Sequence, residues 1–65
     1  MSSFNYVARI IAERDGMDFE EALGLVEETA EEIADVLDEG YFTDVEDILA
    51  DNLGLELDYL PYLLF

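Results

Sequence analysis

Residues 18–40 have the sequence DFEEALGLVEETAEEIADVLDEG, the longest amphipathic pattern in the chain. Its apolar residues recur at intervals of three and four, which predicts one amphipathic helix over residues 19–39. Asp18 and Glu21 fit the Asp-x-x-Glu form of a capping box, and Gly40 is typical of a helix end. The predicted inner stripe consists of Phe19, Ala22, Leu23, Val26, Ala30, Ile33 and Leu37.

The opposite side of this helix is an uninterrupted acidic arc. Like charges four residues apart, such as Glu27 and Glu31, destabilise a helix, whereas mixed signs would stabilise it. A chain that keeps this self-repulsion is expected to use it. The nine carboxylates of the acidic arc are Glu20, Glu21, Glu27, Glu28, Glu31, Glu32, Asp35, Asp38 and Glu39.

A shorter amphipathic helix is predicted before the acidic one, over residues 4–14. Ser3 precedes it as a candidate N-cap, and Gly16 follows it where a left-handed residue is favoured. Its expected inner face consists of Phe4, Val7, Ala8 and Ile11.

Another helix is predicted over residues 43–53, ended by Gly54. Thr43 and Glu46 form a Thr-x-x-Glu capping box at its start. The inner face of this helix is expected to consist of Val45, Ile48, Leu49 and Leu53.

The C-terminal stretch, residues 55–65, is almost continuously apolar. Asp58 can cap a short fourth helix with Pro61 in its first turn, where a missing N–H is tolerated. This segment either docks on the core or forms a homodimer interface, and the sequence favours neither. The interface residues in the second case are Tyr59, Tyr62, Leu63, Leu64 and Phe65.

The composition limits the classes of function. The 65 residues suffice for one domain, residues 1–65, and we expect an all-α compact bundle of three main helices plus a short C-terminal helix. Two basic residues against 18 acidic ones give a net charge of −16, which repels phosphates and anionic membranes and attracts basic proteins. No apolar run or leader is evident, so we expect a cytoplasmic protein that does not bind membranes.

Enzymatic and metal chemistry find little support. The chain has no cysteine or histidine, and its carboxylates lie on an exposed arc, so we expect no enzyme and no cofactor. Residues 35–46 partly fit a calcium loop, but Leu37 occupies a ligand position and cannot bind the ion. Tyr41 and Phe42 are expected to pack over the corner between two helices, with an exposed anchor as the alternative.

The acidic arc suggests imitation of a polynucleotide. It carries nine charges over about 28 Å of helix axis, or one per roughly 3 Å, against about 3.4 Å for one DNA strand. The alternatives are a merely solvated face and a general adaptation to high salt. The expected contacts with a basic nucleic-acid-binding protein are Glu20, Glu27, Glu28, Glu31, Glu32, Asp35, Asp38, Glu39, Asp44, Asp47 and Asp51.

The lysine-free acidic arc, the short length and residues 51–59 resemble small acidic helical proteins of bacteriophages and mobile elements. Several such proteins inhibit host restriction or CRISPR nucleases by imitating DNA. The resemblance implies an inhibitor in the host-cell cytoplasm with a protein target. The alternative from another class is an interaction module that binds through the apolar C-terminal segment, with acidity serving solubility or halophilic adaptation.

Overall fold

The computed structural model describes residues 3–64, which form four α-helices and one 3₁₀ turn. The elements are α1 (Ser3–Asp15), α2 (Phe19–Glu39), α3 (Thr43–Leu53), the turn η1 (Leu57–Tyr59) and α4 (Leu60–Leu64). Among the described residues there is no strand. The predicted all-α bundle of three main helices plus a short C-terminal helix is confirmed.

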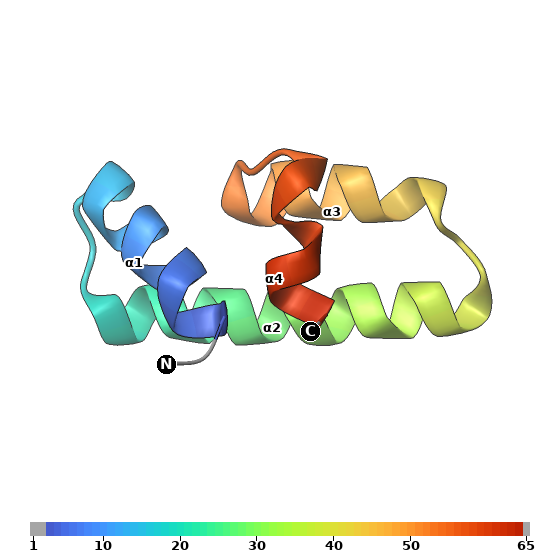
Figure 1. Ribbon diagram of the computed structural model, residues 1–65, viewed down its shortest axis with the longest axis horizontal. Coiled ribbons are helices and arrows are strands. Elements are labelled where there is room, and N and C mark those ends of the chain that lie inside the picture. The colour runs from blue at the N-terminus through green and yellow to red at the C-terminus, as the bar shows by residue number, and fades with distance from the viewer. Residues whose placement is uncertain (1–2, 65) are drawn as a thin grey trace.

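Helix α2 is the base on which the other elements pack. Its 21 residues span about 31 Å, close to the longest dimension of the molecule, 33 Å. Helix α1 folds back over the first half of α2, α3 returns over the second half, and α4 crosses near the middle (Figure 1). The three shorter helices therefore lie on one side of α2, and the other side is left uncovered.

The core is built from the faces that the sequence predicts. Val7, Ala8 and Ile11 of α1 are buried against the α2 stripe. Three of the four residues predicted for the inner face of α3 are buried as well, and the fourth, Ile48, is partly buried. Two residues differ from the predicted stripe: Thr29 is buried although it was not expected there, and Phe19, at the start of α2, is 39% exposed. The buried apolar residues contributed by α2, α3 and the C-terminal segment are Ala22, Val26, Ala30, Ile33, Val45, Leu49, Leu53, Leu55 and Leu63.

The helix ends are set by glycine rather than by side-chain caps. Gly40 adopts φ +90°, and its N–H donates to the Leu37 carbonyl while that of Tyr41 donates to Val36. Gly54 ends α3 with φ +64°. These left-handed positions satisfy carbonyls of the last turn that would otherwise lack donors.

The two predicted capping boxes are wrong. Asp18 has the extended backbone of an N-cap, but its carboxylate accepts no capping hydrogen bond, since an exposed carboxylate can be solvated without capping the helix. Phe42, not Thr43, occupies the N-cap position of α3. The amides of Asp44 and Val45 already donate to the carbonyls of Tyr41 and Phe42, so backbone groups replace the threonine side chain.

The remaining helix starts differ by a residue or two from the prediction. Ser3 is the first residue of α1 and does not precede it. Asp58 lies inside the 3₁₀ turn, where the Tyr59 amide donates to the Glu56 carbonyl, and so does not cap α4. Pro61 lies in the first turn of α4, as predicted.

Two glycine-to-alanine substitutions in and after α2 should change stability in opposite directions. Gly24 lies on the exposed side of α2 with no atom near an added Cβ, so Gly24→Ala should stabilise the fold by about 0.5–1 kcal/mol. Gly40→Ala adds the same methyl group in open space but at positive φ, so it should destabilise by about 1 kcal/mol. Urea denaturation measures both, and equal shifts of the midpoint would contradict this account.

Candidate functional site

The acidic arc lies on the side of α2 that no other helix covers. All nine of its carboxylate side chains are exposed, and Figure 1 shows the uncovered side of α2 along its full length. Successive residues turn by about 100°, which divides the arc into two rows. One row borders an open groove on the surface of the protein and is called the groove-side row: Glu20, Glu27, Glu31 and Asp38. The other row faces α3 and is called the α3-side row: Glu21, Glu28, Glu32, Asp35 and Glu39.

Helix α3 continues the acidic surface beside the second of these rows. The Asn52 amide Nδ2 donates to Glu32 Oε2 at 2.9 Å, which places this edge of α3 next to the α3-side row. By helical geometry Asp44, Asp47 and Asp51 lie on the outer face of α3, about 80–140° around the helix from Asn52, and all three are exposed. The structure therefore places one edge of α3 beside the α3-side row, and the predicted α3 residues lie on the adjoining outer face of that helix.

Glu46 lies apart from this surface. It is exposed, but helical geometry places it on the edge of the inner face of α3 opposite to Asn52, about 100–160° around the helix from Asp44, Asp47 and Asp51. The acidic surface is thus the acidic arc plus the outer face of α3, and it does not include Glu46.

No counter-charge neutralises this surface within residues 3–64. The ion pair in that part of the chain joins Arg14 and Asp15, neither of which belongs to the acidic arc. Arg9 is exposed on α1 and is not within ion-pair distance of any carboxylate that the structure describes. The acidic surface therefore retains its full repulsion, softened only by solvent and salt.

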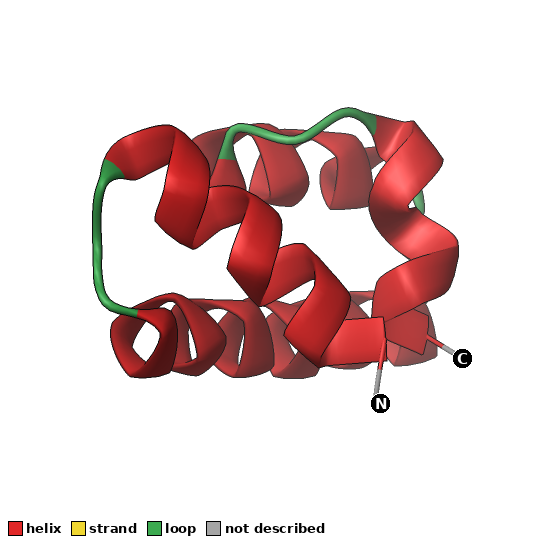
Figure 2. Ribbon diagram, turned by 60° about the vertical axis from the view of Figure 1, so that its left-hand side comes forward, coloured by secondary structure: helices red, strands yellow, loops and turns green. Residues whose placement is uncertain are grey.

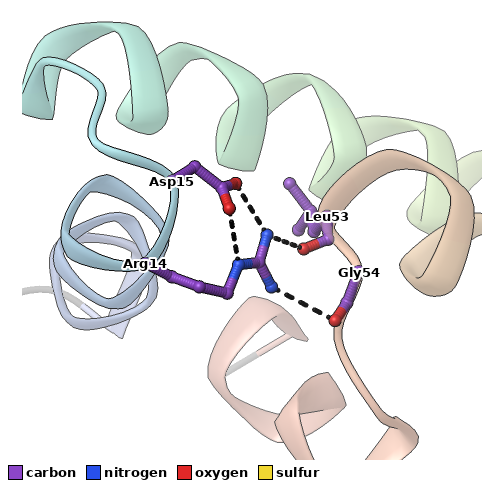
Figure 3. A network of polar contacts seen from close by, with 4 residues as sticks. All are labelled: Arg14, Asp15, Leu53 and Gly54. Carbon is purple, nitrogen blue, oxygen red and sulfur yellow. Dashed lines mark hydrogen bonds and ion pairs between the residues drawn. The ribbon is translucent and has the colours of Figure 1, made fainter.

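Arg14 ties the end of α1 to the end of α3, a contact that the sequence analysis did not anticipate (Figure 3). Its Nη2 donates to the Leu53 carbonyl at 2.7 Å and its Nη1 to the Gly54 carbonyl at 3.2 Å. Nε and Nη2 also donate to the two carboxylate oxygens of Asp15 at 2.9 and 2.8 Å. The side-chain hydrogen bond from Arg14 lowers the pKa of Asp15 below its ordinary value.

This position suits a cation for two reasons. Leu53 is the last residue of α3, so its carbonyl is one of those that find no partner inside the helix. The negative end of the α3 dipole adds a favourable interaction with the guanidinium group. One of the two cations of the chain is consequently committed to the fold.

Arg14→Gln should destabilise the protein by about 1 kcal/mol, because it removes charged hydrogen bonds at a partly exposed site. Arg9→Gln removes the same charge without such contacts and should leave stability nearly unchanged. Denaturant melts of the two variants test this, and equal stabilities would refute the role of Arg14.

The effect of Arg14→Gln on stability should depend on pH. A lowered folded-state pKa of Asp15 contributes stability above the unfolded carboxyl pKa, and this contribution is lost as pH falls through the folded value. The stability difference between wild type and Arg14→Gln should therefore narrow in acid. An NMR titration should show the pKa of Asp15 rising toward its ordinary value in Arg14→Gln and staying low in Arg9→Gln.

The C-terminal segment docks on the core, which is the first of the two alternatives that the sequence left open. Leu63 is buried, and Tyr59 is partly buried against the core. The ring of Tyr62 lies 5.1 Å from that of Tyr6 on α1 and 6.1 Å from that of Tyr59.

Part of this segment still faces solvent. Tyr62 and Leu64 are exposed by 41% and 36%, and Leu57 in the preceding turn by 46%. Phe65, which was also predicted for a dimer interface, lies outside the described residues. The docked segment thus retains an apolar outer side.

Two further apolar side chains are more exposed than expected. Tyr41 and Phe42 are 58% and 68% exposed, so the expectation that they pack over the corner between α2 and α3 is wrong. The turn between the two helices is short, and its backbone carbonyls accept hydrogen bonds from the first amides of α3.

An open groove of about 400 Å³ next to the acidic arc was missed by the sequence analysis. Its apolar lining comes from three helices: Phe4 of α1, Ala30 and Ala34 of α2, and Leu63 and Leu64 of α4. Glu27 and Glu31 of the groove-side row form its polar lining. The signal for this groove in the sequence is a pair of small residues four positions apart, Ala30 and Ala34, on the same side of the helix as Glu27 and Glu31.

The described residues contain no cluster of three or more acidic side chains placed to hold a metal ion. Residues 35–46 do not form a calcium loop, since residues 35–39 are the last residues of α2. None of the helices described for residues 3–64 combines the length and apolar character needed to cross a bilayer.

Comparisons with protein families, with curated proteins and with solved structures find no match to this chain.

Proposed function

We propose that the protein is a nucleic-acid-mimicking inhibitor. Its acidic surface would occupy the basic nucleic-acid-binding site of a host defence or DNA-processing protein. The observation that carries this proposal is the uncovered acidic arc of α2, exposed throughout, with Asp44, Asp47 and Asp51 also exposed on the neighbouring helix α3.

The spacing of charge supports this proposal. The acidic arc carries one charge per roughly 3 Å of axis, similar to one strand of a duplex. The Asn52–Glu32 hydrogen bond holds α3, which carries three further carboxylates on its outer face, beside the arc. A basic channel that binds phosphates would meet carboxylates on a rigid support, and electrostatic attraction would speed the encounter.

The absence of compensating cations argues against a face that serves solubility alone. Solvated helix faces usually mix both signs, which adds a few tenths of a kcal/mol per pair. Within residues 3–64 no arc carboxylate forms an ion pair. The folded chain therefore bears a repulsion that an ordinary solvated surface avoids.

The test uses the protein as bait for a lysate of its source cells. Nucleic-acid-binding proteins should be retained at about 50 mM salt, released at about 300 mM, and displaced by duplex DNA, because both ligands use the same cations. Failure of DNA to displace the retained partner at low salt would overturn the proposal.

A matched pair of variants separates charge placement from net charge. Glu27, Glu28, Glu31 and Glu32, all changed to Gln, should weaken binding of the identified partner at least tenfold and flatten its salt dependence. The control neutralises four exposed carboxylates outside the acidic surface, through E13Q, E46Q, E56Q and D58N. The control variant has the same net charge as the arc variant and should bind the partner nearly as tightly as wild type does. Equal losses of affinity in the two variants would contradict a defined binding surface.

The second candidate is an interaction module that does not imitate nucleic acid. The observation in its favour is the exposed apolar side of the C-terminal segment at Leu57, Tyr62 and Leu64. If Leu57→Ser combined with Leu64→Ser abolished partner binding while the arc variant bound normally, this candidate would replace the first.

A further inference from the structure

The groove beside the groove-side row combines two kinds of surface. Its floor and one wall are apolar, and Ala30 at the floor is only 7% exposed. Leu64, on the α4 wall, is 36% exposed and so remains accessible to a ligand. Figure 2 shows the beginning of α1 beside the end of α4, where Phe4 and Leu63 both line the groove.

The size of the groove limits what fits into it. A volume of about 400 Å³ in an open depression is at the low end of ligand sites and accommodates one or two large side chains, not a whole helix. Alanines at positions 30 and 34 keep the floor low, because longer side chains there would project into this space.

The two carboxylates in the lining of the groove limit which kind of ligand can bind there. Glu27 and Glu31 are four residues apart on α2, about 6 Å along the axis, and both line the groove. These carboxylates repel phosphates and anionic lipid headgroups, which excludes nucleic acid and acidic membranes as occupants. A cationic protein segment with an apolar side chain between its basic residues complements both surfaces.

We propose that this groove receives an apolar side chain from a basic, amphipathic segment of the partner, with neighbouring Lys or Arg side chains on Glu27 and Glu31. The inference rests on the proposed function and deepens it by naming the recognition element. Carboxylate contacts supply salt-sensitive attraction to many basic proteins, whereas the groove selects those with a suitable apolar anchor.

The test uses two helical lysine-rich probe peptides of equal charge. One carries two leucines four residues apart on one face, and the other carries glutamine at these positions. The leucine peptide should bind roughly tenfold more tightly, and the ratio should persist at about 300 mM salt, because burial of apolar surface is not screened. Methyl resonances of Ala30, Ala34, Leu63 and Leu64 should shift with the leucine peptide only.

A matched pair of protein variants locates the effect. Ala34→Gln fills the groove with a polar side chain without changing charge, and should remove the preference for leucine. Ala50→Gln makes the same change at an exposed helical alanine of α3 outside the groove, and should retain the preference. Both sites are exposed in helices, so both variants should fold.

Three results would overturn the inference. These are equal affinity for the two peptides, an undiminished preference in Ala34→Gln, and concentration-dependent shifts of Leu63 and Leu64 without peptide, which would show that a second copy covers the groove. Failure of the proposed function gives a different result. Duplex DNA would then fail to displace the retained partner, whatever the two peptides do.

Discussion

Burial of the apolar stripe of α2 holds the four helices together. Helices α1, α3 and α4 all contact α2, and together they cover one side of it. A single helix of 21 residues therefore organises the core of the whole chain. Its other side needs no apolar residue, which leaves a long surface on which carboxylates can be placed without cost to packing.

This division also explains how a chain with a net charge of −16 can fold. Repulsion between carboxylates acts through water and falls off over a Debye length, about 10 Å at moderate salt. Burial of the core residues acts at contact and is not weakened by the charges on the far side of α2. The committed cation, Arg14, adds a link between α1 and α3 at a point where helix carbonyls need donors.

The sequence was informative where a feature depends on local periodicity or backbone conformation. The inner faces of the helices follow from apolar spacing, and Gly40 and Gly54 end their helices because left-handed backbone favours glycine. Side-chain caps were not predictable, because the exposed carboxylate of Asp18 can be solvated without capping the helix and at Thr43 backbone carbonyls already receive the first amides. The prediction that Tyr41 and Phe42 are packed was wrong, because the sequence around a turn does not show whether its aromatic rings reach the core.

Features that join distant segments were beyond sequence reasoning. The acidic arc followed from periodicity within α2, but its alignment with α3 depends on Asn52 meeting Glu32 across twenty residues. The groove likewise requires Phe4 and Leu63, at opposite ends of the chain, to meet beside Ala30. Such juxtapositions depend on how helices cross, which spacing within any one helix does not determine.

The length of α2 fixes how much of a polynucleotide the proposed imitation could replace. At about 3.4 Å per phosphate, the roughly 28 Å from Glu20 to Glu39 corresponds to about eight phosphates of one strand. A helix axis is nearly straight, whereas a duplex strand winds around its own axis, so the correspondence holds over a fraction of a turn. One copy would therefore block a short tract, and a partner with a longer channel would keep its outlying cations available to nucleic acid.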